Sequence, residues 1–279
     1  MAMKSTAAQK ILIGLAAVLA VLLCIGIFTR HKEPVQEAEP EPAVTEEPVI
    51  VPEETPEPPK EYELTAEELE QLRNELKEDQ AVNSDVVCLI HFKSGLVHAP
   101  VLQSQDVNYY LYRDWKTHEY LSYGSIVLDP VNDLKQDEKN TILYGHYIYE
   151  SRNPDRTLVF TPLAQLMRKE EYEGNKYLCL ITEDEVRYYE TAAVFDCPLE
   201  TYEGAQYTIY GLEYNLPYYT KEYIELYRKN IAEHEYYPTG VAFDENDYLL
   251  TLQTCIEGVP ESREIVVCRE LERRPVIEE

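Results

Sequence analysis

YLLTLQTC, at residues 248–255, is an apolar run that ends on a thiol. A run of this length and composition predicts a buried strand. Arg263 opens a second apolar run eight residues later, and TILYGH at residues 141–146 ends a third run on a histidine. Cys255, Arg263 and His146 would then stand at the ends of three strands. A nucleophile, a fixed cation and a proton carrier are the groups that thiol acyl transfer requires.

These motifs resemble the signature strands of sortases, which pair Thr-Leu-Gln-Thr-Cys and a downstream Arg with an upstream Tyr-Gly-His. From Asn83 to Leu271 the order of segments is similar to a class B sortase, including a long stretch between His146 and Cys255. The matching segments are DVVCLI at 85–90, APVLQ at 99–103, YYL at 109–111, GSIVLD at 124–129 and NTILYGH at 140–146. The resemblance covers roughly two-thirds of the chain, and the combination is more specific than any single motif. Tyr147 departs from the family, which more often has His or Asn there.

The strand and helix patterns predict a mostly β fold, a closed eight-stranded, sortase-like barrel with an N-terminal helix and helical insertions. The β-rich runs are residues 86–92, 99–102, 125–128, 141–146, 177–182, 186–196, 248–255 and 264–269. Thr65 and Glu68 form a capping box that opens an amphipathic helix to about Lys77, expected to pack across the barrel. Further helices are expected after Pro162 and from Lys221 to about Glu233.

The N-terminal residues predict a membrane anchor and a tether. Residues 11–28 form an uninterrupted apolar run, whose length is close to the roughly twenty residues needed to cross a bilayer. The run lacks a small-x-small cleavage site, which favours an uncleaved anchor over a signal peptide. We therefore expect a cytoplasmic N-terminus (1–10), a transmembrane helix (11–29), an acidic, disordered Pro/Glu-rich linker (30–61) and an extracytoplasmic catalytic domain (62–279). The protein would be a single-pass membrane protein.

The charge balance excludes several partners. The net charge is -27, and the nine glutamates of residues 33–59 account for only a third of it. Such an acidic chain is not expected to bind nucleic acid or anionic lipid headgroups. The acidic surface would also suit an amine-bearing acceptor, although a solvated surface is the simpler interpretation.

The cysteines point to one functional thiol. Cys24 lies in the apolar N-terminal run, which leaves five cysteines outside it, and whether Cys88, Cys179, Cys197 or Cys268 form disulfides stays open. Cys88, Cys179 and Cys268 lie in apolar strand patterns and are expected to be buried. The sequence has no Cys-x-x-Cys pair and no His-x-x-x-His, so no metal site and no cofactor is predicted.

The resemblance implies a two-step transpeptidation of the kind that anchors surface proteins in Gram-positive-type cell walls. Cys255 would attack a threonine carbonyl in the C-terminal sorting signal of a secreted protein, and Arg263 would stabilise the oxyanion. His146 would protonate the departing amine and later deprotonate an amine of peptidoglycan or of a pilin subunit. Substrate contacts are expected from Leu111, Gln253, Thr254, Ile256 and Glu257, with the Ile256 N–H also facing the oxyanion.

Several alternatives stay open at this point. The same groups could serve a cysteine hydrolase or protease, and the barrel could be a non-catalytic, membrane-tethered binding module. Without the family pattern, Arg263 would be read as a surface residue in an ion pair with Glu261 or Glu264. The sorting motif, of Asn-Pro-x-Thr or Leu-Pro-x-Thr-Gly type, depends on the 202–237 region, where the matching is weakest. The other candidates for the proton carrier are His31, His91, His98, His118 and His234. The other candidates for the cation that stabilises the oxyanion are Arg269, Arg273 and Arg274.

Overall fold

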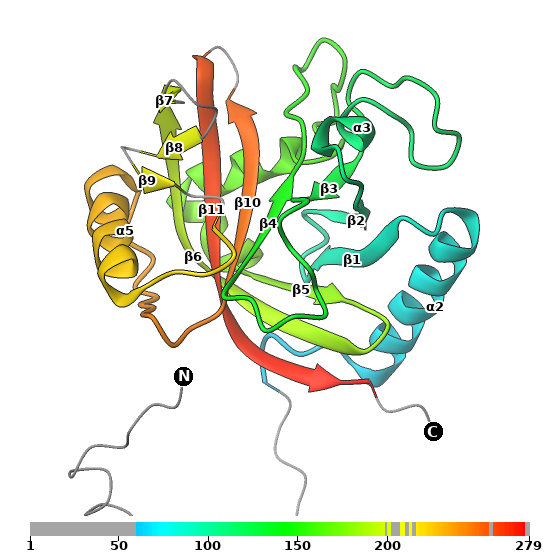
Figure 1. The fold of residues 1–279 in the computed structure, drawn as a ribbon, viewed down its shortest axis with the longest axis horizontal. Helices are drawn as coiled ribbons and strands as arrows, with labels where there is room; N and C mark the ends of the chain where they lie inside the picture. Colours follow the sequence, from blue (N-terminus) through cyan, green and yellow to red (C-terminus); the bar gives the residue numbers. More distant parts are fainter. Residues whose placement is uncertain are drawn as a thin grey trace, which may run out of the picture. The chain divides into compact units, whose positions relative to one another are not determined.

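The computed structural model describes residues 60–198, 200–201, 207–209, 212–213, 216–256 and 259–276. Its main sheet contains β1 (Val86–Phe92), β2 (His98–Leu102), β3 (Ile126–Leu128), β4 (Asn140–Tyr144), β5 (Tyr177–Ile181), β6 (Glu185–Pro198), β10 (Leu249–Ile256) and β11 (Val259–Pro275). The strands close into a barrel in the order β1-β2-β3-β4-β10-β11-β6-β5 (Figure 1). Only the β2–β3 and β4–β10 pairs are parallel. The predicted closed, eight-stranded barrel is confirmed, and most of its strand pairs are antiparallel.

The barrel interior is a single apolar core to which every strand contributes. Representative members from the eight strands are Ile90, Val101, Leu128, Leu143, Leu178, Val194, Leu252 and Val266. Side chains alternate between the two faces of a strand. At the barrel end where β10 finishes and β11 begins, the even-numbered positions of both strands therefore face the interior. The odd-numbered positions face outward.

Helix α2 (Ala66–Val82) covers one outer face of the barrel. Thr65 accepts a hydrogen bond from the Glu68 backbone N–H and the Glu68 carboxylate accepts one from Thr65, which completes the predicted capping box. Leu72 and Leu76 are buried against the outer side of β1 and β5. The helix continues past Lys77 to Val82, because no breaking residue intervenes.

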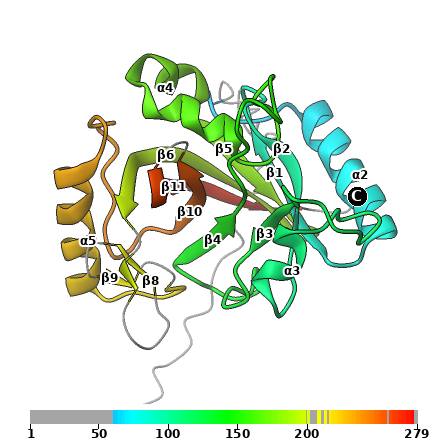
Figure 2. The same cartoon turned by 90° about the horizontal axis from the view of Figure 1, so that it is seen from above.

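Helix α5 (Lys221–His234) covers a different outer face, and the view from above shows α2 and α5 on opposite sides of the barrel (Figure 2). Thr220 caps it by accepting a hydrogen bond from the Tyr223 N–H. Ile224, Tyr227 and Ile231 pack on the outward side chains of β6, β10 and β11. This helix was also predicted, with an end within one residue of that observed.

The remaining elements are short. The helical stretch expected after Pro162 is the 3-10 helix η1 (Thr161–Met167) followed by α4 (Lys169–Asn175). The sequence did not predict α3 (Val107–Leu111) or a three-stranded sheet of β7 (Glu200–Thr201), β8 (Tyr207–Ile209) and β9 (Leu212–Glu213). These segments are too short to show a clear period.

The predicted anchor at residues 11–29 and nearly all of the linker lie outside the described residues. Within the part of the chain that the structure describes, no helix has the length and apolar character needed to cross a membrane. The proposed domain boundaries therefore stay predictions.

Candidate active site

Cys255 and Arg263 are direct cross-strand partners in the β10–β11 pair. Both occupy outward-facing, odd-numbered positions at the end of the barrel where β10 finishes. Cys255 is partly exposed, and Nη1 of Arg263 donates to the Ser262 carbonyl at 2.9 Å. Arg269 pairs instead with Leu249, at the start of β10. The hairpin therefore places a thiol and one particular guanidinium at the same strand end.

His146 reaches this end because β4 runs parallel to β10. Tyr144 is the register partner of Gln253, and the Gly145 N–H donates to the Gln253 carbonyl at 3.2 Å. Parallel strands bring their carboxyl ends to the same edge. His146 thus follows β4 at the edge where Cys255 ends β10.

Gly145 is required by close packing behind His146. A Cβ at this position would lie 2.8 Å from two ring carbons of Phe160, a fully buried residue of the barrel core. The Phe160 N–H also donates to the His146 carbonyl at 3.3 Å. Because Gly145 has no side chain, the Phe160 ring can pack directly against the backbone that carries the His146 imidazole.

The imidazole of His146 is half-buried, and the centroid of the Tyr112 ring lies 5.0 Å from that of the imidazole. The Leu111 carbonyl is hydrogen-bonded to the ring, while Nε2 is buried and has no partner among the described residues. Burial lowers the pKa of His146, the Leu111 hydrogen bond opposes that shift, and the Arg263 charge lowers it further. The lowered pKa favours the neutral ring, with Nδ1 toward Leu111 and Nε2 left for proton transfer.

Leu111 acts through its backbone, a role that sequence reasoning missed. It ends α3, and Gly124 (φ +48°) approaches it so closely that a Cβ there would lie 2.1 Å from the Leu111 carbonyl oxygen. A glycine is the residue that tolerates both this φ and this approach. Gly124 opens the quoted GSIVLD segment and was the available signal.

The other expected substrate contacts divide between the two faces of β10. Gln253 faces outward like Cys255, is 6% exposed, and its Oε1 has no partner in the described chain. Thr254 is 2% exposed and faces the barrel interior, so its position does not favour contact with a substrate lying over Cys255. Ile256 ends β10, and Glu257 lies outside the described residues.

The remaining cysteines and histidines lie elsewhere. All five described cysteines are free, and four of them, Cys88, Cys179, Cys197 and Cys268, are buried. Burial raises the pKa of each of these four thiols to about 12. His91 and His98 face each other across β1 and β2 with Nδ1 atoms 3.1 Å apart, and His234 Nδ1 is 2.7 Å from the Asn230 carbonyl. Cys255 is thus the accessible thiol of the described chain.

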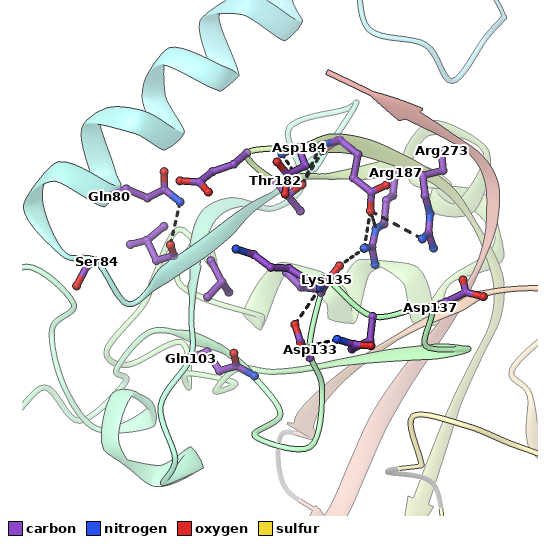
Figure 3. A pocket seen from close by; sticks show the side chains of 16 residues that line it. Gln80, Ser84, Gln103, Asp133, Lys135, Asp137, Thr182, Asp184, Arg187 and Arg273 are labelled. Atoms are coloured by element: carbon purple, nitrogen blue, oxygen red, sulfur yellow. Dashed lines mark hydrogen bonds and ion pairs between the residues drawn. The ribbon is translucent and has the colours of Figure 1, made fainter. Parts of the chain in front are cut away.

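A cavity of about 580 Å³ at the opposite end of the barrel is a poor candidate for the same chemistry. Figure 3 shows Lys135 extending across it and Arg187 held beside it. Arg187 donates to Glu185 and to the Leu134 carbonyl, both at 2.5 Å. The residues that line this cavity include no cysteine and no histidine. Across the described ranges, no group of three or more His, Cys, Asp or Glu side chains is placed to hold a metal ion.

Two curated relatives are similar to the chain in sequence. Sortase B of Listeria monocytogenes is 28% identical over 188 residues, which cover 66% of this chain and 68% of the relative. Sortase B of Staphylococcus aureus is 31% identical over 115 residues, covering 41% of this chain and 44% of the relative. No family model matches the chain.

The fold agrees with these relatives. A Staphylococcus aureus sortase B–substrate complex superimposes with a TM-score of 0.58 at 22% identity, covering 72% of this chain and 86% of that structure. At that identity the match shows a shared fold. In sequence and in fold the chain is similar to class B sortases, and this similarity supports a class B-like cysteine transpeptidase.

Proposed function

We propose that Cys255 is the nucleophile that cleaves a C-terminal sorting signal after threonine and transfers the acyl group to an amine. The observation that carries this proposal is the direct pairing of Cys255 with Arg263 at the strand end that His146 also reaches. Thiol, guanidinium and imidazole are thereby held by neighbouring strands of one rigid sheet, a placement that lowers the entropy cost of bringing them together.

In the first step, Nε2 of His146 accepts the thiol proton and Sγ of Cys255 bonds to the threonine carbonyl carbon. The oxyanion that forms lies against the Arg263 guanidinium and the Ile256 N–H. The C–N bond then breaks, Nε2 returns its proton to the departing amine, and a thioester remains on Cys255. The lowered pKa of His146 supports this role, because a neutral ring can accept the proton.

In the second step, an acceptor amine attacks the thioester carbonyl and gives its proton to Nε2 of His146. The C–S bond breaks, the thiolate is released, and a new amide joins the two substrates. We propose an amine of cell-wall peptidoglycan or of a pilin subunit as acceptor. The donor would be a secreted protein with a C-terminal sorting motif, consistent with the substrate complex of the Staphylococcus aureus structure.

The proposed setting is the outer side of the cell membrane. Residues 11–29 would anchor the chain, and the acidic linker would let the barrel reach substrates at the wall. Protease digestion of intact cells tests this topology. Loss of the barrel with retention of a short N-terminal fragment in the membrane is the expected result, and full protection of the barrel would contradict it.

Mass spectrometry of the full chain in detergent tests the reaction itself. The chain is incubated with peptides of Asn-Pro-x-Thr and Leu-Pro-x-Thr-Gly type, with and without triglycine as amine. A thioester adduct on Cys255 that becomes an amide when amine is added is the expected result. Free acid alone in excess amine would identify a hydrolase, and an adduct on any other residue would overturn the assignment of Cys255.

A further inference from the structure

A second set of polar groups lies directly behind the Cys255–Arg263 pair, on the interior face of the same two strands. Thr254 and Glu264 are register partners on β10 and β11, and they are only 2% and 1% exposed. Thr254 Oγ1 and both carboxyl oxygens of Glu264 have no hydrogen-bond partner among the described residues. Buried polar groups are normally paired, because leaving them unpaired costs free energy. Three unpaired oxygens together indicate a site that a ligand completes.

Glu264 faces a cavity of about 600 Å³, a size typical of small-molecule sites. The cavity combines an apolar wall with a few polar groups. Its lining consists of Tyr147, Asp155, Arg156, Thr161, Pro162, Ala164, Gln165, Met167, Arg168 and Glu264. Both arginines already have carboxylate partners, Arg156 with Glu150 at 3.3 Å and Arg168 with Glu171 at 3.1 Å. Neither arginine therefore pairs with the Glu264 carboxyl, which has no counter-ion among the described residues.

The missing partner is best supplied by a compact cation. An ammonium group offers three N–H donors, which suits the two carboxyl oxygens of Glu264 and the hydroxyl oxygen of Thr254, the register partner of Glu264 that is not itself among the residues lining the cavity. A metal ion is a weaker candidate, since the described residues offer no group of three ligands. The net charge of -27 favours the entry of a cation. Pro162, Ala164 and Met167 provide apolar surface along which an aliphatic stem can lie.

We propose that this cavity binds an aliphatic primary ammonium, such as a lysine-like side chain of a peptide, with Glu264 as its counter-ion. The bound amine is not the nucleophile of the transpeptidation, because Glu264 and Cys255 face opposite sides of the sheet. The site is instead a recognition contact for a second amine. It does not depend on the chemistry proposed for Cys255.

Isothermal titration calorimetry of the full chain carrying Cys255→Ala tests the proposal separately from catalysis. The probe is N-acetyl-lysine N-methylamide, and N-acetyl-norleucine N-methylamide is its neutral match. The lysine probe should bind, the norleucine probe should bind at least about tenfold more weakly, and Glu264→Gln should abolish that difference. Asp155→Asn, at another carboxylate of the same cavity, should change the affinity less than about threefold.

Proton release gives a readout that a merely structural role of Glu264 would not produce. Burial and the Asp196 carboxylate raise the pKa of Glu264 to about 8, so an ammonium that binds the carboxylate at pH 7 should expel about one proton. Titration in buffers of different ionisation enthalpy measures that number, and it should vanish in Glu264→Gln. The other ionisable groups around Glu264 are Tyr147, Asp155, Arg156, Arg168, Asp196 and Tyr237.

Three results would overturn the proposal: no binding of the lysine probe, equal affinity for both probes, or undiminished affinity in Glu264→Gln. If Glu264→Gln fails to fold, Thr254→Val takes its place. That variant keeps the shape of the side chain and removes one hydrogen-bond acceptor. It should therefore lower the affinity for the lysine probe severalfold and leave the affinity for the norleucine probe unchanged. Unchanged affinity of both probes in this variant would also count against the site.

Discussion

Cys255 and Arg263 lie directly opposite each other on β10 and β11, although they are eight positions apart in sequence. The hairpin fixes this relationship, because the register of an antiparallel pair sets which side chains are neighbours. The guanidinium is further held by its hydrogen bond to the Ser262 carbonyl. An oxyanion formed at Cys255 would therefore meet a preorganised planar donor.

Arg263→Lys should lower kcat/KM for peptide transfer by about a hundredfold, because an ammonium keeps the charge and loses the two-pronged geometry. The rate of thioester formation on Cys255, monitored by mass spectrometry, measures this first step of the transfer directly. Arg269→Lys is the matched control on the same strand, since Arg269 pairs with Leu249 at the far end of β10. Equal losses in the two variants would remove any special role for Arg263.

Gly145→Ala should displace His146, since the added Cβ would lie 2.8 Å from the Phe160 ring. We expect a loss of about 1–3 kcal/mol in the free energy of unfolding, together with a fall in activity larger than this loss explains. Gly174→Ala is the control, because a Cβ there meets nothing within 4 Å and the residue lies in α4. It should be neutral or slightly stabilising. Full activity of Gly145→Ala would mean that the ring contact does not position the imidazole.

The pKa of His146 should be below the ordinary value of 6.5 and should rise when the Arg263 charge is removed. Both directions follow from electrostatics, since burial and a nearby cation disfavour the imidazolium. NMR titration of the ring in Cys255→Ala, with and without Arg263→Gln, measures the two values. A pKa that is unchanged by Arg263→Gln would show that the two side chains do not interact.

Glu264→Gln should stabilise the chain increasingly as pH rises. The folded-state pKa of about 8 exceeds the ordinary value of 4.5, so the favourable contribution of the protonated acid is fully present below pH 4.5. It is lost as pH rises through 8, which amounts to roughly 5 kcal/mol at most. Urea unfolding of both proteins from pH 4 to 9 tests this.

The difference between the Glu264→Gln variant and the unmodified chain should grow with pH and level off above about pH 9. Glu225→Gln is the control, because Glu225 is exposed on α5. It should stay within about 0.5 kcal/mol of the unmodified chain at each pH. A pH-independent effect of Glu264→Gln would mean that the carboxyl is not protonated in the folded chain.

The sequence predicted those parts of the fold in which the apolar pattern is strong. All eight barrel strands and both long helices follow from apolar runs and capping residues, and the meeting of Cys255, Arg263 and His146 follows from strand ends. The support of His146 by the Leu111 carbonyl could not be predicted, because a backbone contact between distant loops leaves no pattern of side chains. Only Gly124 hinted at it.

Glu264 shows a second limit of reading local sequence. An adjacent Arg and Glu suggest a surface ion pair, yet alternation along β11 sends Arg263 outward and Glu264 into the barrel. The Glu264 oxygens consequently have no partner in the described chain, so the ion pair considered for these two residues does not form. The apolar residues that follow, Ile265 and Val266, are both buried on opposite faces and gave no clue to the side on which Glu264 lies.

The distribution of thiols within the described ranges has a practical consequence. Cys88, Cys179, Cys197 and Cys268 are buried and hard to ionise, whereas Cys255 is partly exposed at the strand end. An electrophilic fluorophore added to the folded barrel should therefore label one of the five cysteines that the structure describes, with none of those five replaced. The stoichiometry of that label would count competent molecules in a preparation, and its spectrum would report on what binds beside Cys255.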